Sequence, residues 1–205
     1  MREVEKLFSS FQNLHELSTV YGELDAMIAA FKSGTRLACL NGCRNCCDTP
    51  AYNIEVSVFE MLPLSIHLWQ RGEGEYWLQK LRETRPEDPC VLYVSSPSVK
   101  REGGCSHYER RPLLCRLFGF SAITDKQGRS VAALCKEIKK FAPDLEGKIQ
   151  ALIDRGLKVP INSHFAEKVS FLNPFYGQKL HPINEAFRLA LEVVGYRLAL
   201  TSDIA

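Results

Sequence analysis

A chain of 205 residues, 45% hydrophobic and 24% charged, is long enough to bury its own core as one domain. Its formal net charge of +2 is too small to indicate nucleic-acid binding, and its lysines and arginines are scattered instead of clustered. The sequence has no polybasic anchor and no run of about 18 apolar residues that could span a membrane. We therefore expect no nucleic-acid partner and no membrane association.

The N-terminal residues 1–6 mix acidic and basic side chains and lead into an amphipathic pattern. They lack the apolar core and the small-residue cleavage site of a secretory signal. We therefore expect a cytoplasmic protein, in which thiols stay reduced.

The first predicted element is a long amphipathic helix. Apolar residues over 4–31 recur at steps of three and four, which places them on one helical face. Gly34 is expected to end the helix, and weak helix formers near Ser18 or Gly22 mark where it could break. The apolar stripe indicates a core face, with a dimer seam as the alternative.

Four cysteines follow this helix within nine residues, with three, two and no residues between them: Cys39, Cys43, Cys46 and Cys47. Cysteines that only pack as small hydrophobes have no reason to recur so closely, so these indicate metal ligands. The glycine and asparagines among them predict a loop. Because neighbouring side chains diverge in a regular backbone, we expect Cys46 and Cys47 to point into different sites, or to different edges of one larger cluster.

Two helices are predicted next. Ser57 and Glu60 have the spacing of a capping box, which starts a helix that should run to Gln70 and close at Gly72. A shorter helix is predicted over 75–82, before the prolines that follow it.

The remaining cysteines come singly: Cys90, Cys105, Cys115 and Cys135. Strand-like residues 90–94 are predicted to pair with 104–108, and 120–124 with 129–134 in a second hairpin that ends next to the last cysteine. Pro112 is placed to begin a short helical turn that presents the third of these cysteines.

Two arginines, Arg111 and Arg116, lie close to Cys115 in the sequence. Thiolates around a metal carry surplus negative charge, which guanidinium groups stabilise. We therefore expect both arginines to compensate charge near the cluster. His107, next to Cys105, is retained as a reserve ligand.

The total of eight cysteines would also suit a disulfide framework, but that needs an oxidising compartment. In the cytosol, clustered cysteines more often hold metal. Structural zinc usually takes two Cys-x2-Cys pairs, whereas this chain has one such pair and several distant cysteines. A compact run combined with distant cysteines is more typical of iron–sulfur proteins. The pattern favours an iron–sulfur cluster over zinc and leaves both open.

These residues resemble the YkgJ-type cysteine cluster family, also described as the CxxCxxCC or zinc- or iron-chelating domain, over residues 36–136. The resemblance rests on Cys39-x3-Cys43-x2-Cys46-Cys47, the lone Cys90, the Tyr-Glu-x-Arg-Pro-x-x-Cys-Arg run from Tyr108 to Arg116, and the trailing Cys135. It implies a metal-chelating domain whose members are often labelled iron–sulfur oxidoreductases, and which also occurs in flagellin lysine N-methylases. By matching positions, the resemblance makes all eight cysteines ligand candidates.

The spacing Cys39-x3-Cys43-x2-Cys46 is also that of the radical S-adenosylmethionine signature. Those enzymes place the signature near the start of repeated strand–helix units. Hairpins and prolines stand where such units should follow, so we set this alternative aside.

The C-terminal part is predicted to be helical over 144–156 and 184–200, with a packed, aromatic-containing loop over 165–182 between them. The expected fold class is mainly α with small β-hairpins, an irregular α+β arrangement in which a cysteine-cluster metal site joins loops to a helical scaffold. The expected divisions are an N-terminal amphipathic helix, a cysteine-cluster domain, and a C-terminal helical segment packed on it, at 1–35, 36–136 and 137–205.

Two functions remain open from the sequence. The first is a protein that binds iron–sulfur or zinc through up to eight thiolates, with an electron-transfer, oxidoreductase or methyl-transfer role. The second is a non-catalytic, zinc-stabilised module that recognises a protein partner. No phosphate loop or dinucleotide fingerprint names a substrate. In either case the cysteine sulfurs should converge in one or two groups, with Cys90 the least certain member.

Overall fold

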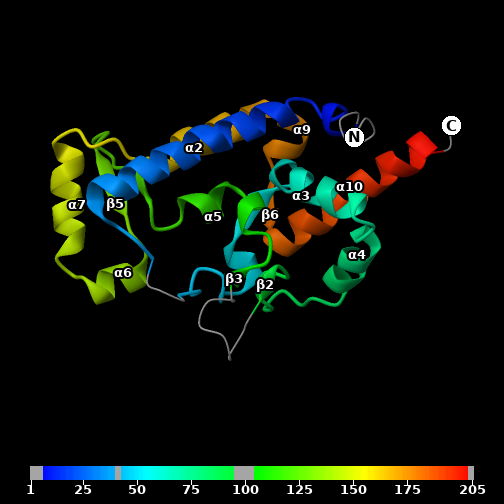
Figure 1. Ribbon diagram of the computed structural model, residues 1–205, viewed down its shortest axis with the longest axis horizontal. Helices are drawn as coiled ribbons and strands as arrows, with labels where there is room; N and C mark the ends of the chain where they lie inside the picture. Colours follow the sequence, from blue (N-terminus) through cyan, green and yellow to red (C-terminus); the bar gives the residue numbers. More distant parts are fainter. Residues whose placement is uncertain (1–6, 40–42, 95–103, 203–205) are drawn as a thin grey trace.

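The computed structural model describes residues 7–39, 43–94 and 104–202 (Figure 1). Within these ranges it is mainly helical, with three antiparallel sheets of two strands each. This confirms the predicted fold class. None of the helices in the described ranges combines the length and the apolar composition that crossing a bilayer requires.

The long N-terminal helix is α2 (Leu14–Thr35), whose apolar stripe is buried as expected for a core face. The buried apolar side chains are Leu14, Leu17, Val20, Tyr21, Leu24 and Phe31. Because α2 contributes Leu14 and Leu24 to one buried cluster and Phe31 to another, it connects the two parts of the molecule that carry the cysteines (Figure 1).

The start of this helix differs from the prediction. The predicted beginning at Val4 lies outside the described residues, and the chain breaks at Asn13, in the left-handed region with φ 59°, instead of near Ser18 or Gly22. The Asn13 side-chain amide donates to the Leu172 carbonyl oxygen at 2.7 Å. This contact with a distant segment supports the left-handed turn, and it could not be read from local helix propensity.

The end of α2 also differs from the prediction. The helix continues through Gly34 and ends at Arg36, which has φ 56°. The Thr35 hydroxyl donates to the Phe31 carbonyl oxygen at 2.7 Å and accepts from the Leu37 backbone N–H at 3.2 Å. Arg36 therefore adopts the left-handed conformation that a glycine was expected to supply, and the Thr35 side chain adds hydrogen bonds that support the turn.

The predicted capping box is present. Ser57 Oγ accepts from the Glu60 backbone N–H at 3.3 Å, and Glu60 Oε2 accepts from the Ser57 backbone N–H at 3.0 Å. It begins α3 (Val58–Gln70), which is closed by Gly72 at φ 72°. The second predicted helix is α4 (Gly74–Arg82). Both helix predictions are confirmed.

The C-terminal helix α10 (Ile183–Ser202) packs across α3 and α4. Trp69 Nε1 donates to the Leu191 carbonyl oxygen of α10 at 2.9 Å. A Cβ atom at Gly74 or at Gly195 would lie 2.3 Å or 2.5 Å from the indole ring. The absence of side chains at these two positions therefore makes room for the tryptophan between the helices.

Both predicted hairpins are present in shortened form. β2 (Tyr93–Val94) pairs with β3 (Gly104–Cys105), and β4 (Ser121–Thr124) pairs with β5 (Ser130–Ala133). Gly128, at φ 78°, lies in the turn between the second pair of strands, where a left-handed residue is needed.

A third sheet joins distant parts of the chain and was not predicted. β1 (Glu55–Ser57) pairs antiparallel with β6 (Leu180–Pro182). The Ile183 backbone N–H, directly after β6, donates to the Ile54 carbonyl oxygen at 2.8 Å. The C-terminal segment is thereby attached next to the start of α3.

The described helices after the second hairpin are α6 (Lys136–Phe141), α7 (Leu145–Asp154), α8 (Asn162–Leu172) and α9 (Pro174–Gly177). The predictions over 144–156 and 184–200 are confirmed by α7 and α10. The packed loop predicted over 165–182 is wrong, because α8 and α9 occupy most of it. Phe165 and Val169 of α8 are buried one helical turn apart, a signal that the surrounding polar and turn-forming residues concealed.

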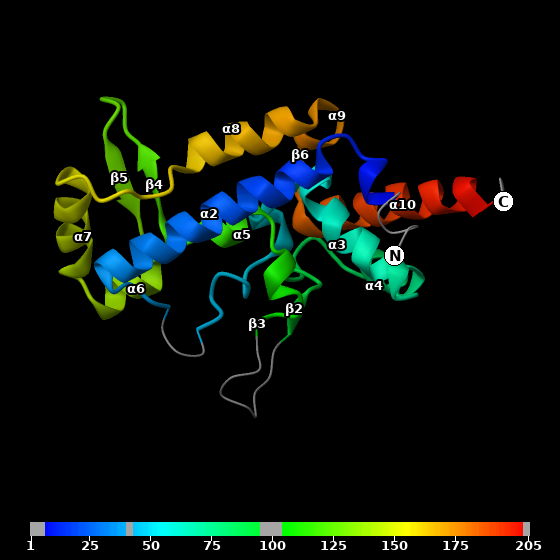
Figure 2. The same ribbon diagram turned by 45° about the horizontal axis from the view of Figure 1, so that its top comes forward.

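The buried apolar side chains form two cores. The first core includes Leu24, Phe59, Leu62, Leu68, Phe187 and Leu191. The second core includes Phe31, Leu37, Phe120, Ala122, Ile138 and Ile149. In Figure 2, the β4–β5 hairpin, α6 and α7 lie at one end of the molecule, and α3, α4 and α10 lie at the other. The loop from Cys43 to Pro50 and the β2–β3 pair lie between these ends, on one side of α2.

Candidate metal centre

The eight cysteines all lie in the described ranges, and none forms a disulfide there. They come from the end of α2, the loop that follows it, the segment before β2, β3, the short helix α5 (Leu113–Leu117), and the junction of β5 with α6. Their order in the sequence is Cys39, Cys43, Cys46, Cys47, Cys90, Cys105, Cys115 and Cys135. Segments from both cores therefore contribute thiols.

The adjacent pair Cys46 and Cys47 lies in a tight turn. The Cys47 and Asp48 backbone N–H groups both donate to the Arg44 carbonyl oxygen, at 2.8 and 3.0 Å. In this turn the two sulfurs lie 3.9 Å apart, so the divergence expected of a regular backbone does not separate them widely. A hydrogen bond from Cys47 lowers the pKa of Cys46 to about 6, and the same interaction raises the pKa of Cys47. This interaction therefore favours the thiolate form of Cys46 and the thiol form of Cys47.

Three further thiols are held at the first core. Cys90 is buried in that core, and Cys105 and Cys115 pack against it. Burial raises the pKa of Cys90 to about 12 and also raises the pKa of the other two. Cys115 interacts electrostatically with both Cys90 and Cys105, so the three thiols are neighbours.

The segment that carries Cys90 is held by α10. The Asn184 side chain accepts from the Val91 backbone N–H at 2.9 Å and donates to the Pro89 carbonyl oxygen at 3.2 Å. The residues on both sides of Cys90 are thus bonded to one buried amide, which fixes the position of the thiol.

Cys135 is held at the second core. It precedes α6, where its sulfur accepts from the Ile138 backbone N–H at 3.4 Å. Cys39 follows α2 and interacts electrostatically with Cys135, Cys46 and Cys43, and burial is the largest cause of its raised pKa. Thiols that are far apart in the sequence are therefore brought into one region.

Among the described residues, no three potential metal ligands lie close enough to hold one ion. The sulfurs of Cys46 and Cys47 lie 3.9 Å apart. The donor set is nevertheless specific in its chemistry. Soft thiolates suit zinc and iron–sulfur clusters, whereas magnesium and calcium require oxygen ligands. The residues present therefore fit zinc or iron, and the assignment of each cysteine as a ligand stays a prediction.

The two arginines occupy different environments. Arg111 interacts electrostatically with Cys46, Cys105 and Cys115; its charge contributes to the lowered pKa of Cys46 and opposes the larger rise that burial causes in the pKa of Cys105 and Cys115. It also donates to the Cys115 carbonyl oxygen at 3.3 Å and stacks on the Tyr108 ring at 3.3 Å. Its position suits charge compensation.

Arg116 is only 8% exposed and makes structural contacts. Its guanidinium donates to Asp25 of α2 at 2.6 Å and to the Arg111 and Glu109 carbonyl oxygens at 2.8 and 2.6 Å. It also lies over the Tyr21 ring, 4.4 Å from the centroid. These contacts tie the Cys115 segment to α2, a role that its place beside a cysteine did not suggest.

Glu60 of α3 anchors the start of α5, the helix that carries Cys115. Its buried carboxylate accepts from the Leu113 backbone N–H at 2.8 Å and from the Tyr21 hydroxyl at 3.1 Å, in addition to its capping bonds with Ser57. One side chain therefore joins α2, α3 and the start of α5. The capping box revealed Glu60 in the sequence, but nothing local revealed these two tertiary partners.

His107, the reserve ligand, contacts other groups. Its Nδ1 lies 3.0 Å from Ser106 Oγ, and its ring meets Trp77 edge to face at 5.7 Å. Burial lowers its pKa, with further contributions from His67 and Arg110. A neutral imidazole beside Trp77 is consistent with a packing role, and its role as a ligand stays a prediction.

Residues 38–136 match the model of the CxxCxxCC family, described as a putative zinc- or iron-chelating domain. The chain carries a CxxCxxCC domain. This confirms the resemblance noted over 36–136, and the CxxCxxCC domain contains all eight cysteines. No curated protein and no solved structure shows a significant match to the chain.

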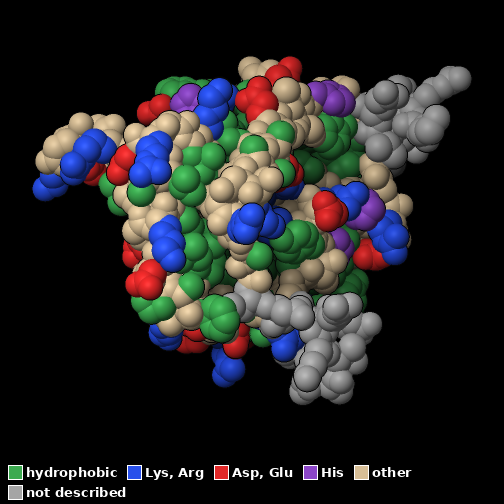
Figure 3. Space-filling view, turned by 60° about the vertical axis from the view of Figure 1, so that its left-hand side comes forward, with side chains coloured by type: hydrophobic (Ala, Val, Ile, Leu, Met, Phe, Trp, Pro, Cys, Tyr) green, Lys and Arg blue, Asp and Glu red, His purple; other side chains and the backbone are tan. Residues whose placement is uncertain are grey.

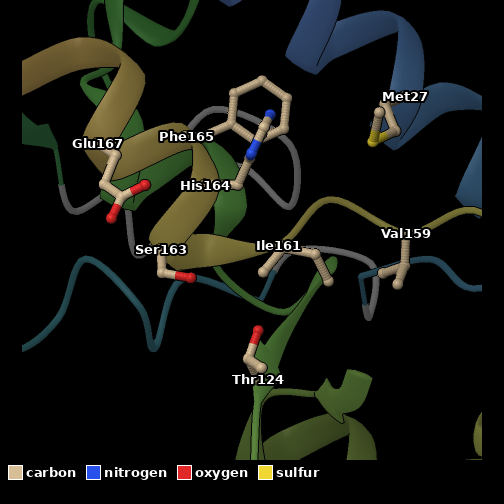
Figure 4. A pocket seen from close by; sticks show the side chains of 8 residues that line it. All are labelled: Met27, Thr124, Val159, Ile161, Ser163, His164, Phe165 and Glu167. Atoms are coloured by element: carbon tan, nitrogen blue, oxygen red, sulfur yellow. The ribbon is translucent and has the colours of Figure 1, made fainter. Parts of the chain in front are cut away.

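A separate hollow of about 470 Å³ has no cysteine in its lining. Figure 4 shows that its lining comes from α2, β4, α8 and the strand-like segment before α8. The lining residues are Met27, Thr124, Val159, Ile161, Ser163, His164, Phe165 and Glu167. This hollow is therefore distinct from the thiols of the CxxCxxCC domain.

The molecular surface agrees with the small net charge. On the face shown in Figure 3, described lysines and arginines are interspersed with acidic and apolar side chains and do not gather into one basic patch. This face offers no focused positive field of the kind that attracts nucleic acid.

Proposed function

We propose that the chain is a cytoplasmic iron–sulfur protein in which the cysteine thiolates of the CxxCxxCC domain hold the cluster. The observation that carries the proposal is the gathering of eight unpaired thiols from six separate segments into one region, within a domain of the zinc- or iron-chelating type. A compact run of cysteines with distant partners favours iron–sulfur over zinc.

The positions of the residues suit an electron-transfer or oxidoreductase role. A bound iron–sulfur cluster supplies one-electron chemistry. Cys90 is buried against the first core and keeps water from that side, whereas Cys39 and Cys46 are exposed. Arg111 offsets thiolate charge at the centre. The exposed side is where a redox partner would approach.

The test is anaerobic purification of the full chain, followed by a visible spectrum and by analysis of iron, acid-labile sulfide and zinc. We expect a brown protein that contains iron and sulfide and whose visible absorption bleaches on reduction. A colourless protein with stoichiometric zinc would contradict the iron assignment while keeping metal chelation.

A second candidate is a zinc-stabilised module that recognises a protein partner. It is favoured by two exposed aromatic side chains on α8 and α9, Phe171 at 72% and Phe175 at 82% exposure. Large aromatics left in water are typical of contact residues. In this case the metal analysis gives zinc, and replacing Phe171 and Phe175 by serine abolishes partner binding without changing zinc content.

A further inference from the structure

The eight thiols divide into two sets of four according to the part of the molecule that holds them. The first-core set is Cys47, Cys90, Cys105 and Cys115. The second-core set is Cys39, Cys43, Cys46 and Cys135. The division falls between Cys46 and Cys47, which are adjacent in the sequence, and the contacts on the two sides of that peptide bond differ.

The first-core set is connected by backbone contacts. Cys90 directly precedes the β2 region, and its carbonyl oxygen accepts from the Tyr93 N–H at 2.8 Å, while Tyr93 is paired with Cys105 across the sheet. Cys115 interacts electrostatically with both Cys90 and Cys105. These three thiols share the first core.

Cys47 is drawn to the same side by the residues that follow it. Pro50 forms a bridge with Pro89, and the Ala51 N–H donates to the Asp88 carbonyl oxygen at 2.9 Å. The chain that leaves Cys47 therefore runs beside the segment that leads to Cys90. Cys47 interacts electrostatically with Cys105 and Cys115, and so does the adjacent Cys46, so the backbone contacts, not these interactions, assign Cys47 to the first-core set.

The second-core set is connected through α2 and α6. Leu37, two residues before Cys39, is buried in the second core, against which Cys135 packs. Cys39 interacts electrostatically with Cys43, Cys46 and Cys135. The Asn45 side chain, next to Cys46, lies near the Glu137 carboxylate at the start of α6 and contributes to the lowered pKa of that carboxyl group. Asn45, before the division, is therefore close to α6, whereas Pro50 and Ala51, after it, are bonded to the segment that leads to Cys90.

Positively charged side chains lie near both sets. Arg111 interacts with Cys105 and Cys115 of the first-core set, and also with Cys46 at the boundary. Lys32 of α2 interacts with Cys39 of the second-core set. Four thiolates around a metal leave surplus negative charge, which Arg111 and Lys32 would offset in the two sets.

We propose that the CxxCxxCC domain of this chain holds two metal centres, each bound by four thiolates, with Cys46 and Cys47 as adjacent ligands to different centres. The inference rests on the proposed metal binding and adds to it the number of centres and the ligands of each. Four thiolates are a complete set for one zinc ion and for either common iron–sulfur cluster. The 3.9 Å between the sulfurs of Cys46 and Cys47 places the two centres next to each other.

The test is a titration of the reduced, metal-free full chain with Co²⁺, monitored by the absorption of tetrahedral cobalt thiolates. We expect the wild-type chain to saturate at two equivalents. The variant Cys39→Ser with Cys135→Ser should saturate at one, and so should Cys105→Ser with Cys115→Ser. Ser106→Ala, which changes a neighbour of Cys105 that is not a candidate ligand, should still saturate at two.

Alkylation of the cobalt-loaded variants, read by mass spectrometry, identifies the thiols that remain protected. In the Cys39 and Cys135 variant we expect protection of the whole first-core set, and in the Cys105 and Cys115 variant protection of the whole second-core set. Saturation of the wild type at one equivalent, or loss of both equivalents in either variant, would overturn the two-centre division while leaving metal binding intact. Absence of cobalt binding by the wild type would overturn the proposed function itself.

Discussion

The helical scaffold of α2, α3 and α10 and the cysteine-bearing segments become ordered by different means. The scaffold helices bury whole apolar faces, with Leu24, Phe59 and Leu191 all at 0% exposure. The segments around Cys90, Cys105 and Cys115 contain two strands of two residues each and one α-helix of five residues. Burial of apolar area stabilises the first region by itself, whereas the second depends on hydrogen bonds to the scaffold and, in our proposal, on metal.

Removal of the metal should give the largest difference in order between the two regions, because it removes a stabilising contribution from the cysteine-bearing segments and none from the scaffold helices. In the metal-free chain, or in the variant Cys46→Ser with Cys47→Ser, we expect proteolytic cuts within 36–56 and 86–136 and retention of most helical circular dichroism. The physical reason is that metal ligation supplies much of the ordering free energy of these loops. Limited proteolysis with mass spectrometry is the measurement, and unchanged protection of both ranges would show that the thiols sit on a self-sufficient core.

Glu60→Gln should give the largest loss of stability from a single contact between the two regions. The carboxylate accepts from Tyr21, Ser57 and Leu113, and an amide would turn one of its oxygens into a donor that faces other donors. We expect a loss of about 3 kcal/mol in the free energy of unfolding. Urea denaturation of the metal-free chain measures it.

The matched control for that change is Glu23→Gln. Glu23 is paired with Lys168 at 2.9 Å on the exposed surface, so the loss should stay within about 0.5 kcal/mol. Equal losses for Glu60→Gln and Glu23→Gln would contradict the anchoring role of the buried carboxylate.

Gly195→Ala tests the scaffold alone. The added methyl group would lie 2.5 Å from the Trp69 ring, so α10 or the indole must shift, at a cost of about 2 kcal/mol. Gly147→Ala in α7, where no atom lies within 4 Å of the added carbon, should instead stabilise the chain by about 0.5 kcal/mol. Thermal denaturation of both variants measures the difference, and a shift of the same sign in both would argue against the packed tryptophan.

Arg116→Lys should give a smaller loss in the free energy of unfolding, because it changes contacts between the Cys115 segment and the scaffold helix α2. Lysine keeps the charge near Asp25 but cannot maintain the planar set of bonds to the Arg111 and Glu109 carbonyl oxygens. We expect a loss of about 1 kcal/mol, measured by urea denaturation. Arg129→Lys on the exposed β4–β5 turn is the control and should be nearly neutral.

The elements that the sequence predicted well are those specified by neighbouring residues. The capping box at Ser57 and Glu60 and the apolar spacing of α10 are local patterns, and both were confirmed. The features that were missed depend on distant partners. The left-handed turn at Asn13 is supported by a hydrogen bond to the Leu172 carbonyl oxygen, and β1 pairs with β6, which lies far along the chain. The loop predicted in place of α8 was wrong because the two buried residues of that helix are too few to dominate its polar surroundings.

The candidate site shows the same contrast between local patterns, which the sequence reveals, and contacts with distant residues, which it does not reveal. The spacing of the first four cysteines and the Arg-Pro-x-x-Cys run were enough to recognise the CxxCxxCC family. They did not reveal that Arg116 would be engaged by α2, or that Asn184 would hold the Cys90 segment. Such contacts are set by tertiary packing, for which a single sequence carries no spacing rule.

The contacts of Asn184 limit how far this protein can be shortened without losing support for Cys90. The recognised CxxCxxCC domain ends at residue 136, yet the amide that fixes Pro89 and Val91 belongs to α10. The partner strand of β1 also lies beyond that boundary. A fragment cut at the edges of the family match would keep every cysteine and lose the part of the chain that sets one of them in place, so the family match covers less of the chain than the contacts that position its cysteines.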